Sequence, residues 1–461
     1  MSQQPHAIAS DLLDRLPHEL TTSIQRHGVP GASVAAWVDG SVFEFSNGVA
    51  NVRTGVASTP DTIFQIGSIT KSFTATLAMQ LVERGTLHLD APIGEYLPGL
   101  RIGDEDALRS ITLRHLLAHT SGIDGDLLTD TGRDDDALAR LTETLGCVRQ
   151  LHPPGAWFSY CNLGYNILGR ALEVASGRIW DDLLRERLLE PLGLGHTVTS
   201  ADEALRHRVA IGHVPGVAGK PELVERPFAP RSNGPSGMTM ACAARDLVAF
   251  GRMHLDGGLS ARGEPILAPA SISAMRTLQV ANPFSHKYRG WGLGWMVFDD
   301  AAERMFGHDG GAAGNCAFLR VLPAQRIVVA LLVNSERGMP VYRDLFERRL
   351  HELAGIEPPT TLTMPGHPTD LVDLALYAGT YHRHGQTIDL RRDGQRLRAR
   401  LHGEYVGLSD VVFELAPLSG DRFVASIAQA HIPVHFFDFD GAGRPRCLHA
   451  SDRAFVRRDA A

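Results

Sequence analysis

Lysine is scarce in this 461-residue chain, which has three lysines, Lys71, Lys220 and Lys287, and carries its remaining positive charge on arginine. Arginine keeps its proton in proteins, whereas a desolvated lysine can release it. A position that needs proton transfer must therefore keep lysine. Each of the three lysines is for this reason a candidate for a chemical role.

Several other features are missing, and each absence excludes a class of protein. The net charge is −7 and no basic stripe occurs, so we expect no nucleic-acid partner. The longest apolar run, 327–333, has the length of a strand, so we expect no membrane insertion. The first twenty residues lack the basic and apolar regions of a secretory signal, which favours the cytoplasm.

The cysteines are few and widely separated. Their spacing fits neither a disulfide framework nor a zinc site, and we expect no metal and no cofactor. The five positions are Cys147, Cys161, Cys242, Cys316 and Cys447.

Hydrophobic periodicity separates helices from strands along the first 350 residues. Helices are predicted at 12–26, 68–83, 163–175 and 180–189. Alternating residues predict strands at 32–37, 42–46, 291–298, 315–321 and 327–333, the first two joined by the hairpin signal Asp39-Gly40. Strands from both ends of this region can share one antiparallel sheet, with helices dominating the middle. The predicted fold class is α+β.

The last hundred residues have a different pattern. Residues 355–368 are rich in Pro, Thr and Gly and are predicted to form a linker. Short alternating runs follow at 387–390, 397–401, 411–415, 423–427 and 434–439, a spacing typical of a small antiparallel barrel. We therefore expect a catalytic domain over 1–358, a linker over 359–370 and a barrel over 371–461.

The first motif with chemical potential is Ser68-Ile69-Thr70-Lys71, at the start of the second predicted helix. Residues three apart on a helix share a face, so the two end side chains can touch, and a neutral lysine amine could take the serine proton. The helix N-terminus would stabilise developing negative charge. The alternative is a serine cap followed by a surface lysine.

The second motif is Tyr160-Cys161-Asn162, directly before the third predicted helix. Alternate side chains project the same way, so a phenol and an amide would face one site. Tyr160 could pass a proton to the leaving group, and Asn162 could hydrogen-bond Lys71 or a substrate amide. The alternative is a helix-capping asparagine beside a buried tyrosine.

The third motif is GHDGG at 307–311, ahead of a predicted strand. Its glycines, Gly310 and Gly311 among them, would let a substrate approach backbone N–H groups closely. His308 could hydrogen-bond an acyl group or the Tyr160 hydroxyl. The alternative is a glycine-rich hairpin.

In this chain order the three motifs resemble the serine β-lactamase and penicillin-binding-protein superfamily. The similarity is greatest to the branch of class C β-lactamases, D-aminopeptidases and family VIII esterases. It also includes VPG at 29–31, FQIGS at 64–68 and LRHLLAHTSG at 113–122. The resemblance implies an antiparallel sheet flanked by helices beside an all-helical lobe, with the site between them.

The resemblance also implies roles. Ser68 would be the nucleophile, Lys71 and Tyr160 would share the base and acid roles, and Asn162 would organise the site. The N–H groups of Ser68 and Gly311 would form the oxyanion hole. His308 stands where the superfamily has lysine.

The residue after His308 bears on substrate choice. Asp309 would place negative charge where a β-lactam carboxylate binds, which argues against β-lactams and for neutral esters, amides or substrates with a free amine.

The C-terminal hundred residues resemble the lipocalin-like barrel of some D-aminopeptidases and of penicillin-binding-protein-type thioesterases that cyclise nonribosomal peptides. Three readings therefore stay open: a hydrolase of esters, amides or D-aminoacyl peptides, an acyltransferase or cyclase, and a catalytically silent ligand-binding protein. The expected partner is a small-molecule ester, amide or peptidyl substrate. The sequence leaves homo-oligomer formation open.

Three further patterns are set aside. His115 and His119 have the spacing of zinc ligands, but no carboxylate completes a site, and a structural role is predicted. The Gly-x-Ser-x-Gly elbow of α/β-hydrolases is absent from the sequence. Alternation would point the Cys161 side chain away from the site.

Overall fold

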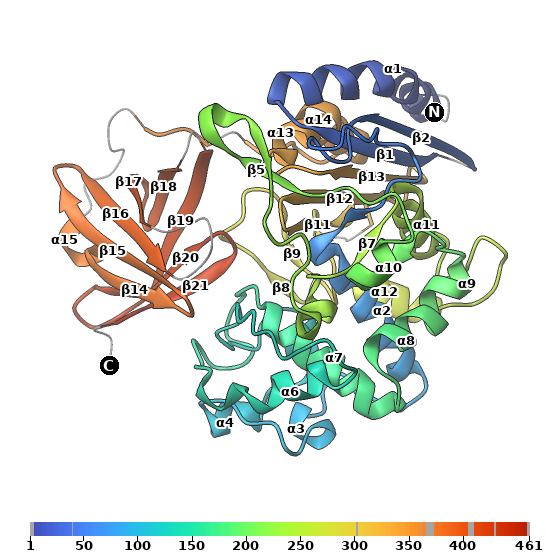
Figure 1. The fold of residues 1–461 in the computed structure, drawn as a ribbon. Coiled ribbons are helices and arrows are strands. Elements are labelled where there is room, and N and C mark those ends of the chain that lie inside the picture. Colours follow the sequence, from blue (N-terminus) through green and yellow to red (C-terminus); the bar gives the residue numbers. More distant parts are fainter. Residues whose placement is uncertain are drawn as a thin grey trace.

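The computed structural model describes residues 4–38, 40–300, 303–360, 362–365, 373–403, 410–427 and 430–458. Its centre is an eight-stranded antiparallel sheet with the order β2-β1-β13-β12-β11-β10-β9-β8 (Figure 1). The strands are β1 Gly31–Val38, β2 Ser41–Gly48, β8 Val280–Ala281, β9 Gly290–Trp291, β10 Met296–Val297, β11 Phe306–Ala312, β12 Asn315–Leu322 and β13 Ile327–Val333. The predicted α+β class with one antiparallel sheet is confirmed.

Strand β13 shows why the sheet lies inside the molecule. All seven of its residues, IVVALLV, are buried, as expected of a strand covered on both faces. On one face pack α1 Gln4–His27, α13 Gly338–Tyr342 and α14 Arg348–Ala354, with a π-helical turn at Arg343–Glu347 between the last two. On the other face pack α2 Thr70–Glu83 and α11 Ala244–Leu255.

The middle of the chain forms the helical lobe next to α2 (Figure 1). The predicted third helix is observed as α7, which ends where Gly177 adopts a φ of +70°. The fourth is α-helical only to Leu184, after which Arg185–Leu189 forms a π-helical turn. The lobe comprises α3 Ile93–Tyr96, α4 Glu105–Leu108, α5 Leu113–Leu117, α6 Ala137–Glu143, a 3₁₀ turn Leu145–Cys147, α7 Asn162–Ser176 and α8 Trp180–Leu184.

The prediction of a single strand over 291–298 is wrong. The chain turns after β9 and returns as β10, so that Met296 pairs with Trp291. Gly294 lies in this turn with a φ of +84°, a conformation that favours glycine.

Short elements complete this part of the chain. They are α9 Glu190–Leu192, α10 Ala201–Ala204, α12 Pro269–Arg276, β3 Phe64–Gln65, β4 Thr197–Val198, β5 His213–Pro215, β6 Pro221–Leu223, β7 Ala241–Cys242 and 3₁₀ turns Gly67–Ile69, Val217–Gly219 and Arg231–Ser236. None of the helices in the described ranges combines the length and apolarity needed to cross a lipid bilayer.

The C-terminal strands form a closed antiparallel barrel in the order β14 to β21, as predicted for this region. Three of its strands, β14, β20 and β21, were not predicted, since Arg and His interrupt their alternation. The elements are α15 Leu374–Tyr377, β14 Gly379–Arg383, β15 Gln386–Asp393, β16 Arg396–Gly403, β17 Val411–Ser419, β18 Arg422–Ile427, β19 Ala430–Phe439, β20 Pro445–Ala450 and β21 Arg453–Arg457. Asp39 of the predicted hairpin turn and half of the predicted linker 359–370 lie outside the described residues.

Candidate active site

Ser68 and Lys71 are brought together at the start of α2. Ser68 lies in the 3₁₀ turn Gly67–Ile69, and α2 begins two residues later. The Lys71 Nζ lies 3.1 Å from the Ser68 Oγ, and it also donates a hydrogen bond to the carbonyl of Ser236. The local geometry therefore allows direct proton transfer between the two side chains.

Lys71 is completely buried, and its surroundings favour the neutral amine. Burial lowers its pKa well below the ordinary value, and the positive charge of Arg453 lowers that pKa further, whereas Asp126 raises it. The rings of Tyr160 and Tyr165 lie 4.9 Å and 5.6 Å from the Nζ. A neutral amine at this position has the lone pair that a general base needs.

Tyr160 lies beside both residues. Burial raises the pKa of its phenol, against the opposing influence of Ser68 and Arg453. The hydroxyl faces Ser68 but has no well-aligned hydrogen-bond partner among the described residues. It is therefore a protonated phenol that can donate to an incoming group.

Asn162 is the first residue of α7 and lines the same space. Its Nδ2 donates to the Asp126 Oδ1 at 2.7 Å, so its protein partner is this carboxylate and not Lys71, the partner suggested by the sequence. The Asn162 Oδ1 is buried and has no hydrogen-bond partner in the described chain. It can accept a hydrogen bond from a substrate N–H.

Strand β11 passes unusually close to the 3₁₀ turn that carries Ser68. A Cβ on Gly310 would come within 1.8 Å of the Ile66 carbonyl oxygen and 3.2 Å of the Ser68 nitrogen. A Cβ on Gly67 would lie 2.5 Å from the Gly311 nitrogen. Glycine at these positions lets the backbones at Ser68 and Gly311 approach each other, which is compatible with the predicted oxyanion hole.

We expect Gly310→Ala to lower kcat by about 10²-fold, because the added methyl would push β11 away from Ser68 and separate the two N–H groups. Steady-state kinetics with an activated ester measures the effect. Gly94→Ala is the matched control, since a Cβ there meets no atom within 4 Å. Equal activity of both variants would contradict the role given to this strand.

His308 and Asp309 lie on opposite faces of β11. The His308 ring is buried and packs against Trp291 at 5.1 Å between ring centroids. Burial lowers its pKa to about 3, so the ring is neutral, and its Nδ1–H donates to the Asp309 carbonyl at 2.6 Å. The Nε2 then carries the lone pair, and no described residue donates to it.

The prediction that Asp309 presents a negative charge to the substrate is wrong. Its carboxylate forms an ion pair of 2.6 Å with Arg320, a side chain only 3% exposed. It lies near Tyr342 on the face of the sheet covered by α13. Successive side chains of a strand point to opposite faces, so Asp309 must point away when His308 faces the site.

Three further charged residues lie at the site, and no local pattern in the sequence indicated them. The barrel contributes Arg383 and Arg453, which both form ion pairs with the buried Asp126 of the helical lobe. Burial alone would raise the pKa of Asp126, but these two charges hold it below its usual range. The Arg453 guanidinium lies 4.9 Å from the centre of the Tyr160 ring.

Backbone contacts fix this part of the barrel against the catalytic residues. The Tyr160 N–H donates to the Asp452 carbonyl at 2.8 Å, and the Ala454 N–H donates to the Ser159 Oγ at 3.1 Å. The turn between β20 and β21 and the start of β21 are therefore bonded to the irregular segment before α7 that carries Tyr160. No local sequence pattern marks this turn, because its partners lie some 300 residues away in the chain.

We expect Arg453→Met to shift the acid limb of the pH profile of kcat/KM to higher pH. Removing this positive charge raises the pKa of Lys71, so a smaller fraction of the enzyme holds the neutral amine at a given pH below that pKa. The loss is therefore larger at pH 6 than at pH 9. Arg453→Lys should restore the profile, and Arg446→Met, half exposed on β20, is the control. A profile unchanged by Arg453→Met would contradict the electrostatic role.

The other residues considered in the sequence have structural positions. His115 caps α5 by accepting a hydrogen bond from the Thr112 N–H. The His119 ring stacks on Tyr160 at 4.1 Å between centroids. Cys161 is buried and caps α7, and burial raises the pKa of its thiol to about 12, which makes it unreactive.

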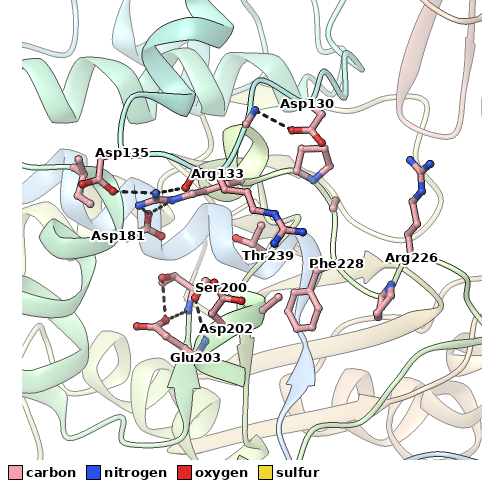
Figure 2. A pocket seen from close by; sticks show the side chains of 18 of the residues that line it. Asp130, Arg133, Asp135, Asp181, Ser200, Asp202, Glu203, Arg226, Phe228 and Thr239 are labelled. Carbon is pink, nitrogen blue, oxygen red and sulfur yellow. Dashed lines mark hydrogen bonds and ion pairs between the residues drawn. The ribbon is translucent and has the colours of Figure 1, made fainter. Parts of the chain in front are cut away.

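A cavity of about 420 Å³ starts at Ser68 and continues into the barrel. Its polar lining residues are Ser68, Asp126, Asn162, Gln386, Arg383, Ser451 and Arg453. A larger groove of about 920 Å³ is lined by charged side chains between the helical lobe and the segment 225–231, and it does not include the predicted catalytic residues (Figure 2). There Arg231 forms ion pairs with Asp135 and Asp181, which neutralises part of its lining.

Comparisons with known proteins agree with this geometry. Residues 11–354 match the family described as Beta-lactamase. Penicillin-binding protein 4 of Amycolatopsis lactamdurans is 45% identical over 363 residues, which cover 78% of this chain and 94% of that protein. The crystal structure of SurE with D-Leu is 27% identical with a TM-score of 0.75, covering 97% of this chain and all of that chain. The D-amino acid amidase from Ochrobactrum anthropi SV3 shares the fold, at 24% identity and a TM-score of 0.62 over 75% of this chain and 99% of that chain.

Proposed function

Because the chain belongs to the Beta-lactamase family of serine hydrolases and acyltransferases, we propose that it forms an acyl-enzyme on Ser68. The observation that carries this proposal is a completely buried lysine amine 3.1 Å from a serine hydroxyl. We also propose the domain division at 1–358, 359–370 and 371–461, with the active site completed by the barrel.

The reaction follows from the positions of the polar atoms. The Ser68 Oγ attacks the substrate carbonyl while its proton passes to the neutral Lys71 amine. The N–H groups of Ser68 and Gly311 stabilise the oxyanion. When the tetrahedral intermediate collapses, the phenol of Tyr160 donates a proton to the departing oxygen or nitrogen and recovers one from Lys71. Water or an amine then attacks the acyl-enzyme and releases the acyl group.

The proposed substrates are esters or amides, including D-aminoacyl compounds, in preference to β-lactams. His308 is neutral and gives no fixed positive charge to an antibiotic carboxylate, an argument that replaces the one from Asp309. The unpaired Asn162 Oδ1 suits a substrate N–H, as in an amino acid amide. The similarity to SurE, solved with D-Leu, supports a D-aminoacyl group.

Acyl transfer or peptide cyclisation is the second candidate. The barrel covers Ser68 on one side, and the apolar cavity limits the access of water, which favours attack by a bound amine. Incubation of one activated acyl substrate with and without an added amine separates the two activities. Free acid in both cases indicates a hydrolase, whereas amide formation indicates a transferase.

The proposal as a whole is tested by intact-mass spectrometry after treatment with a fluorophosphonate, together with turnover of p-nitrophenyl esters, D-aminoacyl amides, D-aminoacyl thioesters and nitrocefin. We expect one adduct on Ser68, turnover of esters or D-aminoacyl compounds and little cleavage of nitrocefin. The absence of both an adduct and turnover would favour the third reading, a silent binding protein.

A further inference from the structure

The C-terminal barrel is filled at one end and hollow at the other. At the end covered by α15, aromatic rings pack against one another. The ring centroids of Tyr377, Phe423 and Phe436 lie 4.9 to 5.1 Å from one another. Tyr381 lies 5.7 Å from Phe436 and is also fully buried. None of these rings lines the cavity, so they form a plug beneath it.

The hollow end is apolar. Side chains from seven of the eight strands line it, and all of them are aliphatic or aromatic residues that belong to the barrel core or pack against it. The barrel residues that line it, apart from those at its mouth, are Ile388, Leu401, Phe413, Leu415, Ala425, Ile427, Ile432, Val434, Leu448, Ala450 and Phe455. Protein interiors are close-packed, and an eight-stranded barrel either fills its interior or holds a ligand. A void of this kind beside a packed plug indicates a binding pocket.

The cavity is continuous with the candidate catalytic centre. The same space of about 420 Å³ is lined by Ser68 and Gly311 at one end and by Phe413 and Leu415 of β17 within the barrel. A volume of this size is in the range of small-molecule pockets. A molecule whose carbonyl lies at Ser68 can therefore extend into the barrel without crossing solvent.

Polar groups are confined to the mouth of the pocket, where the barrel meets the helical lobe. Arg383 and Arg453 are held there by Asp126, and the Gln386 Oε1 accepts hydrogen bonds from Arg383. These contacts satisfy the charged groups and leave the interior of the pocket to apolar atoms. An apolar lining of this kind favours the binding of apolar groups, because their burial removes apolar surface from water.

We propose that the barrel holds an apolar chain of the substrate, such as a medium-length acyl chain or a bulky aliphatic side chain. This inference rests on the proposed acyl-enzyme at Ser68. The substrate class is thus an ester or amide with a polar reacting end and an apolar tail. The barrel is then part of the specificity pocket.

The test uses the whole chain and p-nitrophenyl esters from acetyl to dodecanoyl, with a second series that lengthens the alcohol and keeps the acyl group constant. Each methylene that enters the pocket should raise kcat/KM about fourfold until the pocket is full. A rise in the first series places the tail on the acyl side, and a rise in the second places it on the leaving group. No rise in either series would overturn the proposal.

Variants of the pocket should move the chain-length optimum in opposite directions. Ala425→Leu fills the lumen and should shift the optimum to shorter chains, whereas Leu401→Ala, at a partly buried position, enlarges it and should shift the optimum to longer chains. Val412→Leu is the control, because Val412 is 52% exposed on β17, next to Phe413. An optimum that is the same in all four proteins would contradict a tail in the barrel.

A fluorophosphonate with short alkyl groups separates this proposal from the one it rests on. Labelling of Ser68 without any dependence on chain length rejects the pocket and keeps the acyl-enzyme. Absence of labelling in the wild type rejects the acyl-enzyme itself. Labelling of Ala425→Leu at the wild-type rate shows that this variant is folded.

Discussion

Lys71→Met is expected to lower kcat/KM by about 10³-fold or more while making the protein more stable. Methionine cannot take the proton of Ser68, so the nucleophile is no longer activated. It does fit the buried position without a charge, whereas burial of the lysine costs free energy because the unfolded chain keeps that lysine protonated. Activity and stability should therefore change in opposite directions.

The stability gain has a definite pH dependence. The pKa of Lys71 is lowered in the folded state, so folding releases a proton at any pH between that value and the unfolded pKa of about 10.4. The cost of keeping the lysine is therefore larger at pH 7 than at pH 10, and so is the gain from methionine. Urea denaturation at the two pH values measures the gain in the free energy of unfolding.

Lys287→Met serves as the control, since Lys287 lies outside the cavity at Ser68 and its replacement should leave activity unchanged. If Lys71→Met were less stable than the wild type at both pH values, Lys71 would be a charged and well-paired side chain. That outcome would remove the general base from the mechanism.

Ser68→Ala is expected to abolish the covalent adduct and to lower kcat by about 10⁴-fold or more, because no other group takes over the nucleophilic attack. The fold should be retained, because the substitution removes only a small hydroxyl that is hydrogen-bonded to Lys71. Mass spectrometry after treatment with a fluorophosphonate, followed by peptide mapping, measures the first effect. Progress curves with an activated ester measure the second.

Ser72→Ala is a matched control one turn along α2. Its hydroxyl donates to the Gly294 carbonyl at 2.7 Å and so contributes to the core, not to the proposed chemistry. Replacing it should cost about 1 kcal/mol of stability and leave the Ser68 adduct intact. Turnover retained by Ser68→Ala would rule out the acyl-enzyme at this position.

The parts of the fold and site that depend on local spacing could be predicted from the sequence. Ser68 and Lys71 are one helical turn apart, so their contact follows from the chain geometry alone. The buried strand β13 and the helix α7 were equally evident from their hydrophobic pattern. The roles given to the site residues stay predictions.

Two errors concern information that the sequence did contain. Strand alternation places His308 and Asp309 on opposite faces, so the sequence already argued against Asp309 as a substrate contact. Gly292 and Gly294 interrupt the segment 291–298, and glycines of this kind indicate a turn. In both cases the local pattern determines the structure, against the family expectation for Asp309 and the apolar composition of 291–298.

The contribution of the barrel could not be predicted in this way. Arg453 has an ordinary position among the arginines of the sequence, and its importance comes from its ion pair with Asp126, 327 residues earlier in the chain. A contact of this range depends on how two independently packed parts meet. No periodicity in a single sequence indicates a contact between residues so far apart.

The distance between Asp126 and Arg453 along the chain also affects biosynthesis. The residues proposed to carry the chemistry leave the ribosome early, with Ser68 and Lys71 ahead of most of the sheet. The arginine that pairs with Asp126 and lowers the pKa of Lys71 belongs to β21, the last strand of the barrel. A nascent chain therefore holds the proposed nucleophile and base without the completed electrostatic environment, and reaches the finished arrangement only after the barrel has been synthesised.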